Sequence, residues 1–378
     1  MPDAIPFVDL SRTVRRLQPD IDGIWKDCLN ECEFIGQQSV AELESQLSRH
    51  LNVQNVICCA NGTDALVIAL KASGVTAGMK VALPNLTFWA TFEAVVHAGG
   101  TPVLIDCDPI DLQMNFSELR LAHQKHSLQA VVLAHLFGWT SHSLSKMRNF
   151  CQEEGILVIE DSAQAFGVIS NGRSIFSDAR IATLSFYPAK VIGGSADGGA
   201  ITTPDPELAQ ICRKLINHGR TSHYSYSHVG WNSRMSGLNS RYLSTVLKFA
   251  DQILKDRLRL HREYSNFARQ TLQEFGITNY DAPKDVTGNG YLAVMTTAGD
   301  HAAALVERLK AARVNCGRIY PETIDQQMPA KNALRVSDLV FSKTFVKRVV
   351  NLPLFWGMTQ DEQDQICRTF KAVLSSND

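Results

Sequence analysis

The chain has 378 residues, of which 45% are hydrophobic and 20% charged, and this length allows a large core divided between two domains. With 37 Lys and Arg against 38 Asp and Glu, the formal net charge is -1, so no global field attracts nucleic acid or an anionic membrane. Nine cysteines, an odd count without CxxC or Cys/His zinc spacing, argue against a disulfide framework and a structural metal.

No segment has the features of a signal peptide or a membrane span. The N-terminal residues lack an apolar core, and no apolar run reaches the roughly 18 residues that a membrane-spanning helix needs. We therefore expect a cytoplasmic protein with reduced thiols and without a nucleic-acid or membrane partner.

Between residues 56 and 203, short apolar runs alternate with helical patterns. Helical spacing of apolar residues occurs at 64–73 and 144–154. The runs between them are rich in Val, Ile and Leu: VICCA, KVALP, TPVLID, AVVLAHL, ILVIED, ATLSFY and GGAITT. This alternation predicts an α/β fold with a mainly parallel, seven-stranded sheet and helices on both faces.

Residues 238–274 combine apolar residues at helical spacing with many charges, which predicts one long helix or two broken ones. After them, 289–297 is a strand candidate, and 302–312 and 360–374 have helical patterns. We therefore expect a large α/β domain at 1–250 and a small α+β domain at 251–378.

A lysine among small residues is the first candidate for chemistry. Lys190 follows the apolar strand pattern IATLSFY and precedes Gly198 and Gly199 in SFYPAKVIGGSADGGAITT. Small residues around it leave room for a bulky cofactor. A solvent-exposed lysine, the commoner fate of this residue type, is the alternative that this segment leaves open.

A carboxylate at a strand end is the second candidate. Four apolar residues, Ile156 to Ile159, lead to Glu160 and Asp161, and ligands bind at the carboxyl ends of strands in α/β sheets. A protonated pyridinium nitrogen would give Asp161 a cationic partner, since pyridoxal phosphate (PLP) chemistry combines such an Asp with a Schiff-base Lys. The alternative is that Asp161 is a helix N-cap.

Two turns at strand ends are suited to other parts of the same cofactor. The amides of Gly62 and Thr63 and the Thr63 hydroxyl open a helix, where they could hold a phosphate. An ordinary turn with a helix cap explains the same letters. Phe88 and Trp89 follow the strand pattern KVALP, where an aromatic face could stack on a ring, and core packing is the alternative for at least one of them.

Asn232 and Arg234 stand in the Gly-containing segment HVGWNSRMSGLN, at positions suited to an anionic ligand or to a surface turn. A metal site would need clustered ligands. We predict none, because the candidate histidines lack tight ligand spacing: His135, His218, His223 and His228.

Taken together, these segments resemble the DegT/StrS family of PLP-dependent nucleotide-sugar aminotransferases, which have the fold type I architecture. The resemblance covers nearly the whole chain, through IPFVDLSR, ANGTDAL, LPNLTFWATFEAVVHAGGTPVLIDCD, HLFG, VIEDSAQAFG, SFYPAK, GGAITT, NHGR, GWNSR and NLPLFWGMT. It implies PLP as the cofactor and a homodimer with shared active sites.

The resemblance also implies a role for each matching residue. Lys190 would form the Schiff base and act as the catalytic lysine, Asp161 would pair with the pyridinium nitrogen, and Gln164 would lie beside the ring oxygen. The other implied contacts are phosphate binding by Gly62, Thr63 and Ser185, ring stacking by Phe88, a reach to the neighbouring subunit's cofactor phosphate by Asn232, and substrate binding by Arg234.

The implied reaction moves an amino group from L-glutamate to a nucleotide-linked keto-sugar for polysaccharide or related biosynthesis. Asn-Ser-Arg at 232–234 resembles members that act at C3, on a UDP-keto-uronic acid or a dTDP-keto-deoxysugar, and C4 is the alternative. Departures at Ser236, Asn239, Ser240 and Ile319 leave the substrate open. A dehydratase of the family would have His at position 190, and a regulatory protein that binds PLP or sugar without catalysis is the non-enzyme alternative.

Overall fold

The centre of this computed structural model, which describes residues 4–376, is an eight-stranded sheet. β9 runs antiparallel to both its neighbours, and the remaining pairs are parallel. All seven expected strands lie in the sheet, and a two-residue strand from the C-terminal part extends it. In spatial order they are β1 (Asn55–Cys59), β9 (Gly199–Thr203), β8 (Ala182–Ser185), β5 (Leu157–Asp161), β4 (Ala130–Ala134), β2 (Lys80–Pro84), β3 (Thr101–Ile105) and β15 (Leu334–Arg335).

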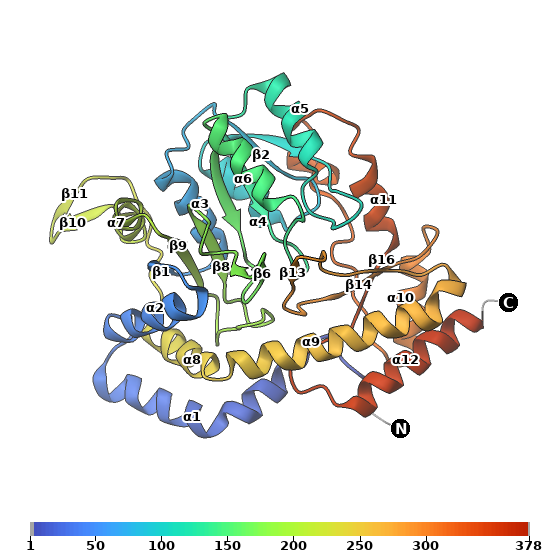
Figure 1. Cartoon of the computed structure of the whole chain (residues 1–378). Coiled ribbons are helices and arrows are strands. Elements are labelled where there is room, and N and C mark those ends of the chain that lie inside the picture. The colour runs from blue at the N-terminus through green and yellow to red at the C-terminus, as the bar shows by residue number, and fades with distance from the viewer. Residues whose placement is uncertain (1–3, 377–378) are drawn as a thin grey trace.

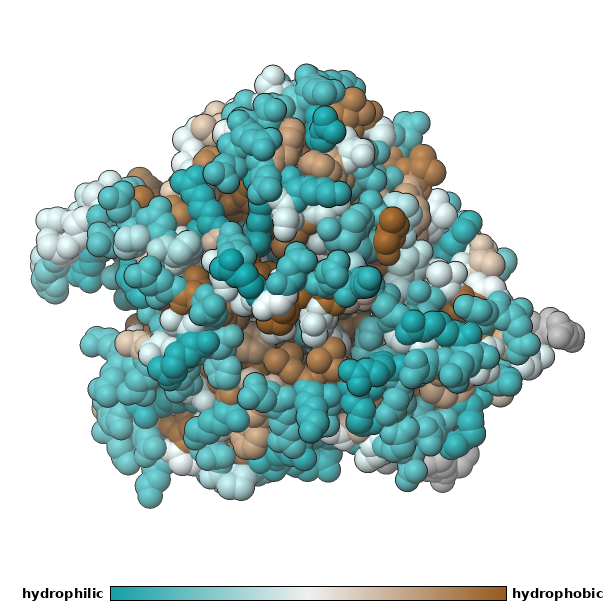
Figure 2. Space-filling model, viewed as in Figure 1, coloured by the Kyte–Doolittle hydropathy of each residue, from teal (hydrophilic) through white to brown (hydrophobic). Residues whose placement is uncertain are grey.

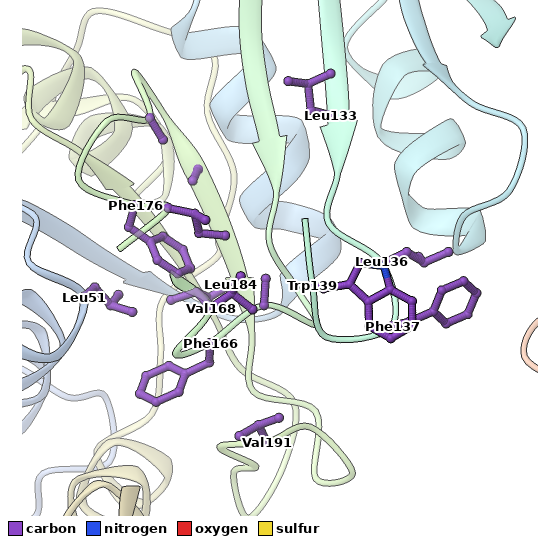
Figure 3. Packing of buried hydrophobic residues seen from close by; sticks show 14 of the residues in the cluster. Leu51, Leu133, Leu136, Phe137, Trp139, Phe166, Val168, Phe176, Leu184 and Val191 are labelled. Atoms are coloured by element: carbon purple, nitrogen blue, oxygen red, sulfur yellow. The ribbon is translucent and has the colours of Figure 1, made fainter. Parts of the chain in front are cut away.

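Both faces of this sheet are buried, which explains its unbroken apolar strands. Along β4, Ala130 and Val132 join one core cluster, while Val131 and Leu133 join the other. Figure 3 shows part of the second cluster, where Leu136 lies beside Phe137 and Trp139. The helices between the strands are α3 (Gly62–Ala72), α4 (Trp89–His97), α5 (Phe116–His126), α6 (Leu144–Glu153) and α7 (Pro206–Leu215).

The helical region at 238–274 consists of two helices rather than one. Two residues separate the end of α8 (Gly237–Leu247) from the start of α9 (Ala250–Phe267), and short π and 3₁₀ turns follow at Ala268–Leu272 and Gln273–Phe275. α9 runs below the sheet in Figure 1, with α1 (Leu10–Glu31), α2 (Gln38–Leu51) and α8 on its N-terminal side. Among residues 4–376, no helix is both long enough and apolar enough to span a membrane.

The C-terminal part builds a second, antiparallel sheet beside α9. Because β15 lies in the large sheet, residues beyond 250 contribute to both sheets, and the division at residue 250 stays a prediction. The strands are β12 (Thr278–Tyr280), β14 (Ala293–Thr296) and β16 (Val349–Leu352), with α10 (Ala302–Ala311), α11 (Val340–Arg348) and α12 (Gln360–Ser375). Smaller elements are β6 (Ile169–Ser170), β7 (Arg173–Ser174), β13 (Val286–Thr287), the hairpin β10 (Arg220–Ser222) with β11 (Ser225–Tyr226), and 3₁₀ turns at Ile324–Gln326 and Met328–Ala330.

Candidate active site

A cavity of about 860 Å³ lies at the carboxyl ends of the central parallel strands. Figure 2 shows apolar side chains gathered in a hollow at the middle of the visible face, above the line of α9. Seven of the residues expected to bind the cofactor line this one cavity: Gly62, Thr63, Phe88, Asp161, Gln164, Ser185 and Lys190.

Asp161 is the last residue of β5, where its carboxylate is oriented by two hydrogen bonds. Oδ2 accepts from the Thr91 hydroxyl at 2.7 Å, and Oδ1 accepts from the Ala163 amide at 3.2 Å. Thr91 in turn bonds Thr87 at 2.8 Å. A turn rather than a helix follows Asp161, so the helix N-cap alternative is wrong.

The neighbouring carboxylate, Glu160, serves the structure instead. Arg148 donates two hydrogen bonds to it, and His135 lies 2.8 Å from its Oε2. Burial by itself raises the pKa of Glu160, but the Arg148 charge and the His135 hydrogen bond outweigh this effect and lower the pKa to about 2. This buried cluster holds β5 and β4 together directly beside Asp161.

The turn before α3 lies close to Ser185 at the end of β8. Asn61 caps the helix by accepting a hydrogen bond from the Asp64 amide at 2.7 Å. The turn is therefore a helix cap, as the alternative interpretation expected, and this leaves phosphate binding by its other amides open. The cap uses the Asp64 amide and does not involve the amides of Gly62 and Thr63 at the cavity wall. A Cβ at Gly62 would lie 2.8 Å from the Ser185 Cβ, so only glycine allows this close approach.

Lys190 is half-buried in the tight loop that follows β8. Its amide bonds the Tyr187 carbonyl at 2.8 Å, and a Cβ at Gly193 would lie 2.1 Å from the Pro188 oxygen, so the loop folds closely on itself. The Lys190 Nζ lies 5.2 Å from the centroid of the Tyr291 ring. The side chain therefore lines the cavity instead of standing free in solvent.

The two aromatic residues after β2, Phe88 and Trp89, have different surroundings. Phe88 is 54% exposed, and its ring centroid lies 5.9 Å from that of Tyr320 across the cavity. Trp89 packs on Phe92 at the core, as the core-packing alternative expects. Gln164 is buried and donates to the Tyr320 hydroxyl at 2.9 Å, which fixes the side chain between the two walls.

Asn232 and Arg234 do not reach the cavity within one chain. Both side chains are exposed, and Arg234 donates to the Asn232 oxygen at 2.7 Å. Their expected roles toward substrate and a neighbouring subunit's cofactor stay predictions.

Sequence reasoning missed three residues that line or support this cavity: Thr91, Tyr291 and Arg257. Thr91 could have been noticed only after Asp161 was placed, because the contact joins residues 70 positions apart. Arg257 could have been noticed in the sequence pattern of its helix. It interrupts a stripe of buried residues at helical spacing, Ile253, Leu260 and Tyr264, on an otherwise amphipathic helix.

A group of possible metal ligands occurs away from this cavity, at Asp108, Asp111 and His142. Their ligand atoms are engaged with the protein, since one Asp111 oxygen accepts from His142 Nδ1 and from the Ser141 hydroxyl. This arrangement gives no reason to assign a metal, and the expectation of a metal-free protein stays untested.

Comparisons with known proteins agree with this geometry. A model of the DegT/DnrJ/EryC1/StrS aminotransferase family matches residues 17–371. The chain belongs to this family. The expected PLP-dependent sugar aminotransferase class and the fold type I architecture are thereby confirmed.

Two relatives and one solved structure illustrate the range of the family. The UDP-2-acetamido-2-deoxy-3-oxo-D-glucuronate aminotransferase of Pseudomonas aeruginosa is 32% identical over 323 residues, 85% of this chain and 88% of that protein. The pleiotropic regulatory protein of Geobacillus stearothermophilus is 28% identical over 364 residues, 96% of each chain. The structure of NtdA from Bacillus subtilis with bound cofactor PMP has a TM-score of 0.92 and 25% identity, and covers 99% of this chain and 86% of that one.

The residues of the cavity fit the cofactor of this family. Helix α3 opens toward it at Gly62, in a space that any side chain would fill. Asp161 offers an anion on the cavity wall and Lys190 an amine, while the exposed ring of Phe88 offers an aromatic face. These four residues are chemically complementary to the phosphate, the pyridinium nitrogen, the aldehyde carbon and the ring of PLP, respectively.

Proposed function

We propose that this aminotransferase moves an amino group from L-glutamate to a nucleotide-linked keto-sugar, with Lys190 as the covalent attachment point of PLP. The observation that carries this proposal is the convergence of Lys190 and Asp161 on one cavity, together with the turn at Gly62 where α3 begins. Family membership supplies the reaction class.

In this proposal each residue has one task. PLP, when bound, supplies the electron sink that stabilises negative charge at the reacting carbon. Asp161, oriented by Thr91, keeps the ring nitrogen protonated. The Lys190 Nζ would take a proton from the α-carbon of L-glutamate, and in the second half of the reaction it would give a proton to the sugar carbon that receives the amine. Gly62, Thr63 and Ser185 bind the phosphate, Phe88 covers the ring, and Gln164 orients the ring oxygen.

For the sugar, we propose amination at C3 of a UDP-linked keto-uronic acid. The name of the Pseudomonas aeruginosa relative supports this choice, because it specifies a 3-oxo-glucuronate carried by UDP. A dTDP-keto-deoxysugar and amination at C4 are the competing substrates. Incubating the PLP-loaded protein with L-glutamate and each keto-sugar, and identifying the aminated carbon by NMR, decides among them. If no keto-sugar is aminated, the proposed function is wrong.

The non-catalytic alternative has one observation in its favour, the regulatory name of the Geobacillus stearothermophilus relative. Against it stands the gathering of Lys190 and six other residues expected to bind the cofactor around one cavity. The same incubation separates them, since a regulatory protein would bind PLP or sugar without forming 2-oxoglutarate. A homodimer with shared active sites and a cytoplasmic location also stay proposals.

Gly62→Ala tests the proposed phosphate turn. The new methyl group would meet the Ser185 Cβ at 2.8 Å, and such overpacking costs about 1–3 kcal/mol. We expect the Kd for PLP to rise about tenfold or more, measured by fluorescence titration. Gly23→Ala is the matched control, because a Cβ at Gly23 meets no atom within 4 Å. Equal Kd values for both variants would contradict the assignment of this turn.

A further inference from the structure

We infer that Arg257, which lines the cavity, binds a carboxylate of the amino donor there. This inference rests on the proposed function, which it deepens by giving the donor's negative charge a partner in the protein. Arg257 lies on α9, the long helix below the sheet in Figure 1, and it is 5% exposed. It lines both the main cavity and an adjoining cavity of about 500 Å³ that also contains Lys190.

The hydrogen bonds of Arg257 leave its charge without a counterion. Nη1 points at three carbonyl oxygens, those of Gly290, Tyr291 and Leu354, at 3.3 to 3.4 Å. Nε has no hydrogen-bond partner, and no ion pair with Arg257 occurs in the part of the chain that the structure describes. Within the described residues the guanidinium therefore has carbonyl groups as partners but no carboxylate, the group that arginine binds most strongly.

A buried cation of this kind needs an anion. Arg148, the other deeply placed arginine beside the site, meets this need with Glu160. Burial lowers the pKa of Arg257 to about 10, so the guanidinium is still protonated near neutral pH. Leaving it unpaired costs free energy that a bound carboxylate would recover.

The position of Arg257 suits an amino acid better than a remote part of the sugar nucleotide. Tyr291 contacts both groups, because its carbonyl oxygen lies 3.4 Å from Arg257 Nη1 and its ring lies 5.2 Å from Lys190 Nζ. An amino donor has to present its amine at Lys190 and carries its carboxylates a few bonds away. Arg257 is thus placed to hold the donor while Lys190 handles its proton.

The test uses the PLP-loaded protein and glutarate, a dicarboxylate without an amine, as the probe. Arg257→Gln removes the charge and Arg257→Lys keeps it, so comparing the two variants separates anion binding from the contacts of the guanidinium with the three carbonyl groups. We expect calorimetry to show glutarate binding at least about tenfold weaker in Arg257→Gln, given the strength of charged hydrogen bonds. Arg257→Lys, which keeps the charge without the fork, should bind glutarate with intermediate affinity.

Two further measurements complete the design. Hydroxylamine attacks the cofactor without needing a carboxylate, and UDP-glucuronic acid carries its carboxylate on the sugar, so their rate and affinity should not change in either variant. The inference is wrong if glutarate binds the wild type and Arg257→Gln equally, if it does not bind the wild type, or if UDP-glucuronic acid is the ligand that loses affinity. If glutarate binding follows Arg257 but L-glutamate donates no amine, the proposed function fails while the anion site stands.

Discussion

Replacement of Lys190 with alanine is expected to reduce turnover about 10³-fold or more, the scale of a lost acid–base group together with the covalent link to the cofactor. The turn at Gly62, proposed to bind the phosphate, and the carboxylate of Asp161 remain in place, so the variant should still bind PLP without a covalent bond. Single-turnover kinetics with L-glutamate measure the first effect, and borohydride labelling followed by mass spectrometry measures the second.

Two variants control the lysine experiment. Lys190→Arg keeps the positive charge, but a guanidinium stays protonated and cannot carry the proton, so we expect it to be as inactive as the alanine variant. Lys248→Ala removes an exposed lysine just before α9 and should leave turnover unchanged. Turnover of Lys190→Ala within tenfold of the wild type would show that another group carries the reaction.

Asp161→Asn is expected to lower kcat about 10²- to 10³-fold, because it removes a preorganised charge that acts on the reacting system. The side chain keeps its shape, and the Thr91 hydroxyl can still donate to its oxygen. PLP binding should therefore change much less than kcat, and stopped-flow measurement of the L-glutamate half-reaction separates the two.

Asp197→Asn is the matched control for the aspartate, since this exposed carboxylate lines the same cavity away from β5. We expect it to keep kcat close to the wild-type value. A similar loss in both variants would mean that the total charge of the cavity matters, and the specific role of Asp161 would be refuted.

Much of the large domain could be predicted because its strands are buried on both faces. The run AVVLAHL begins where β4 begins, at Ala130, and β4 ends two residues earlier than this run, at Ala134. β15 could not be foreseen, because Leu334 and Arg335 form a strand only by pairing with Val103 and Leu104. The break between α8 and α9 could not be located from the sequence, because the helical spacing of apolar residues continues through it.

The candidate site was predictable where a residue's place in a motif carries the chemistry. Asp161 ends a strand and Gly62 and Lys190 each follow one, and the sheet brings these strand ends to one edge. Thr91 and Arg257 act through contacts that depend on the tertiary fold. For Asn232 and Arg234, the single chain gives no contact with the cavity.

The absorption spectrum of the purified protein after addition of PLP, recorded before and after L-glutamate, tests the central claim most directly. The account predicts a visible band from PLP joined to Lys190, a loss of that band when L-glutamate is added, and release of one equivalent of 2-oxoglutarate. Lys190→Ala should not form the protein-linked band. A wild-type protein that forms no such band, or whose band L-glutamate leaves unchanged, would contradict glutamate-dependent transamination through Lys190.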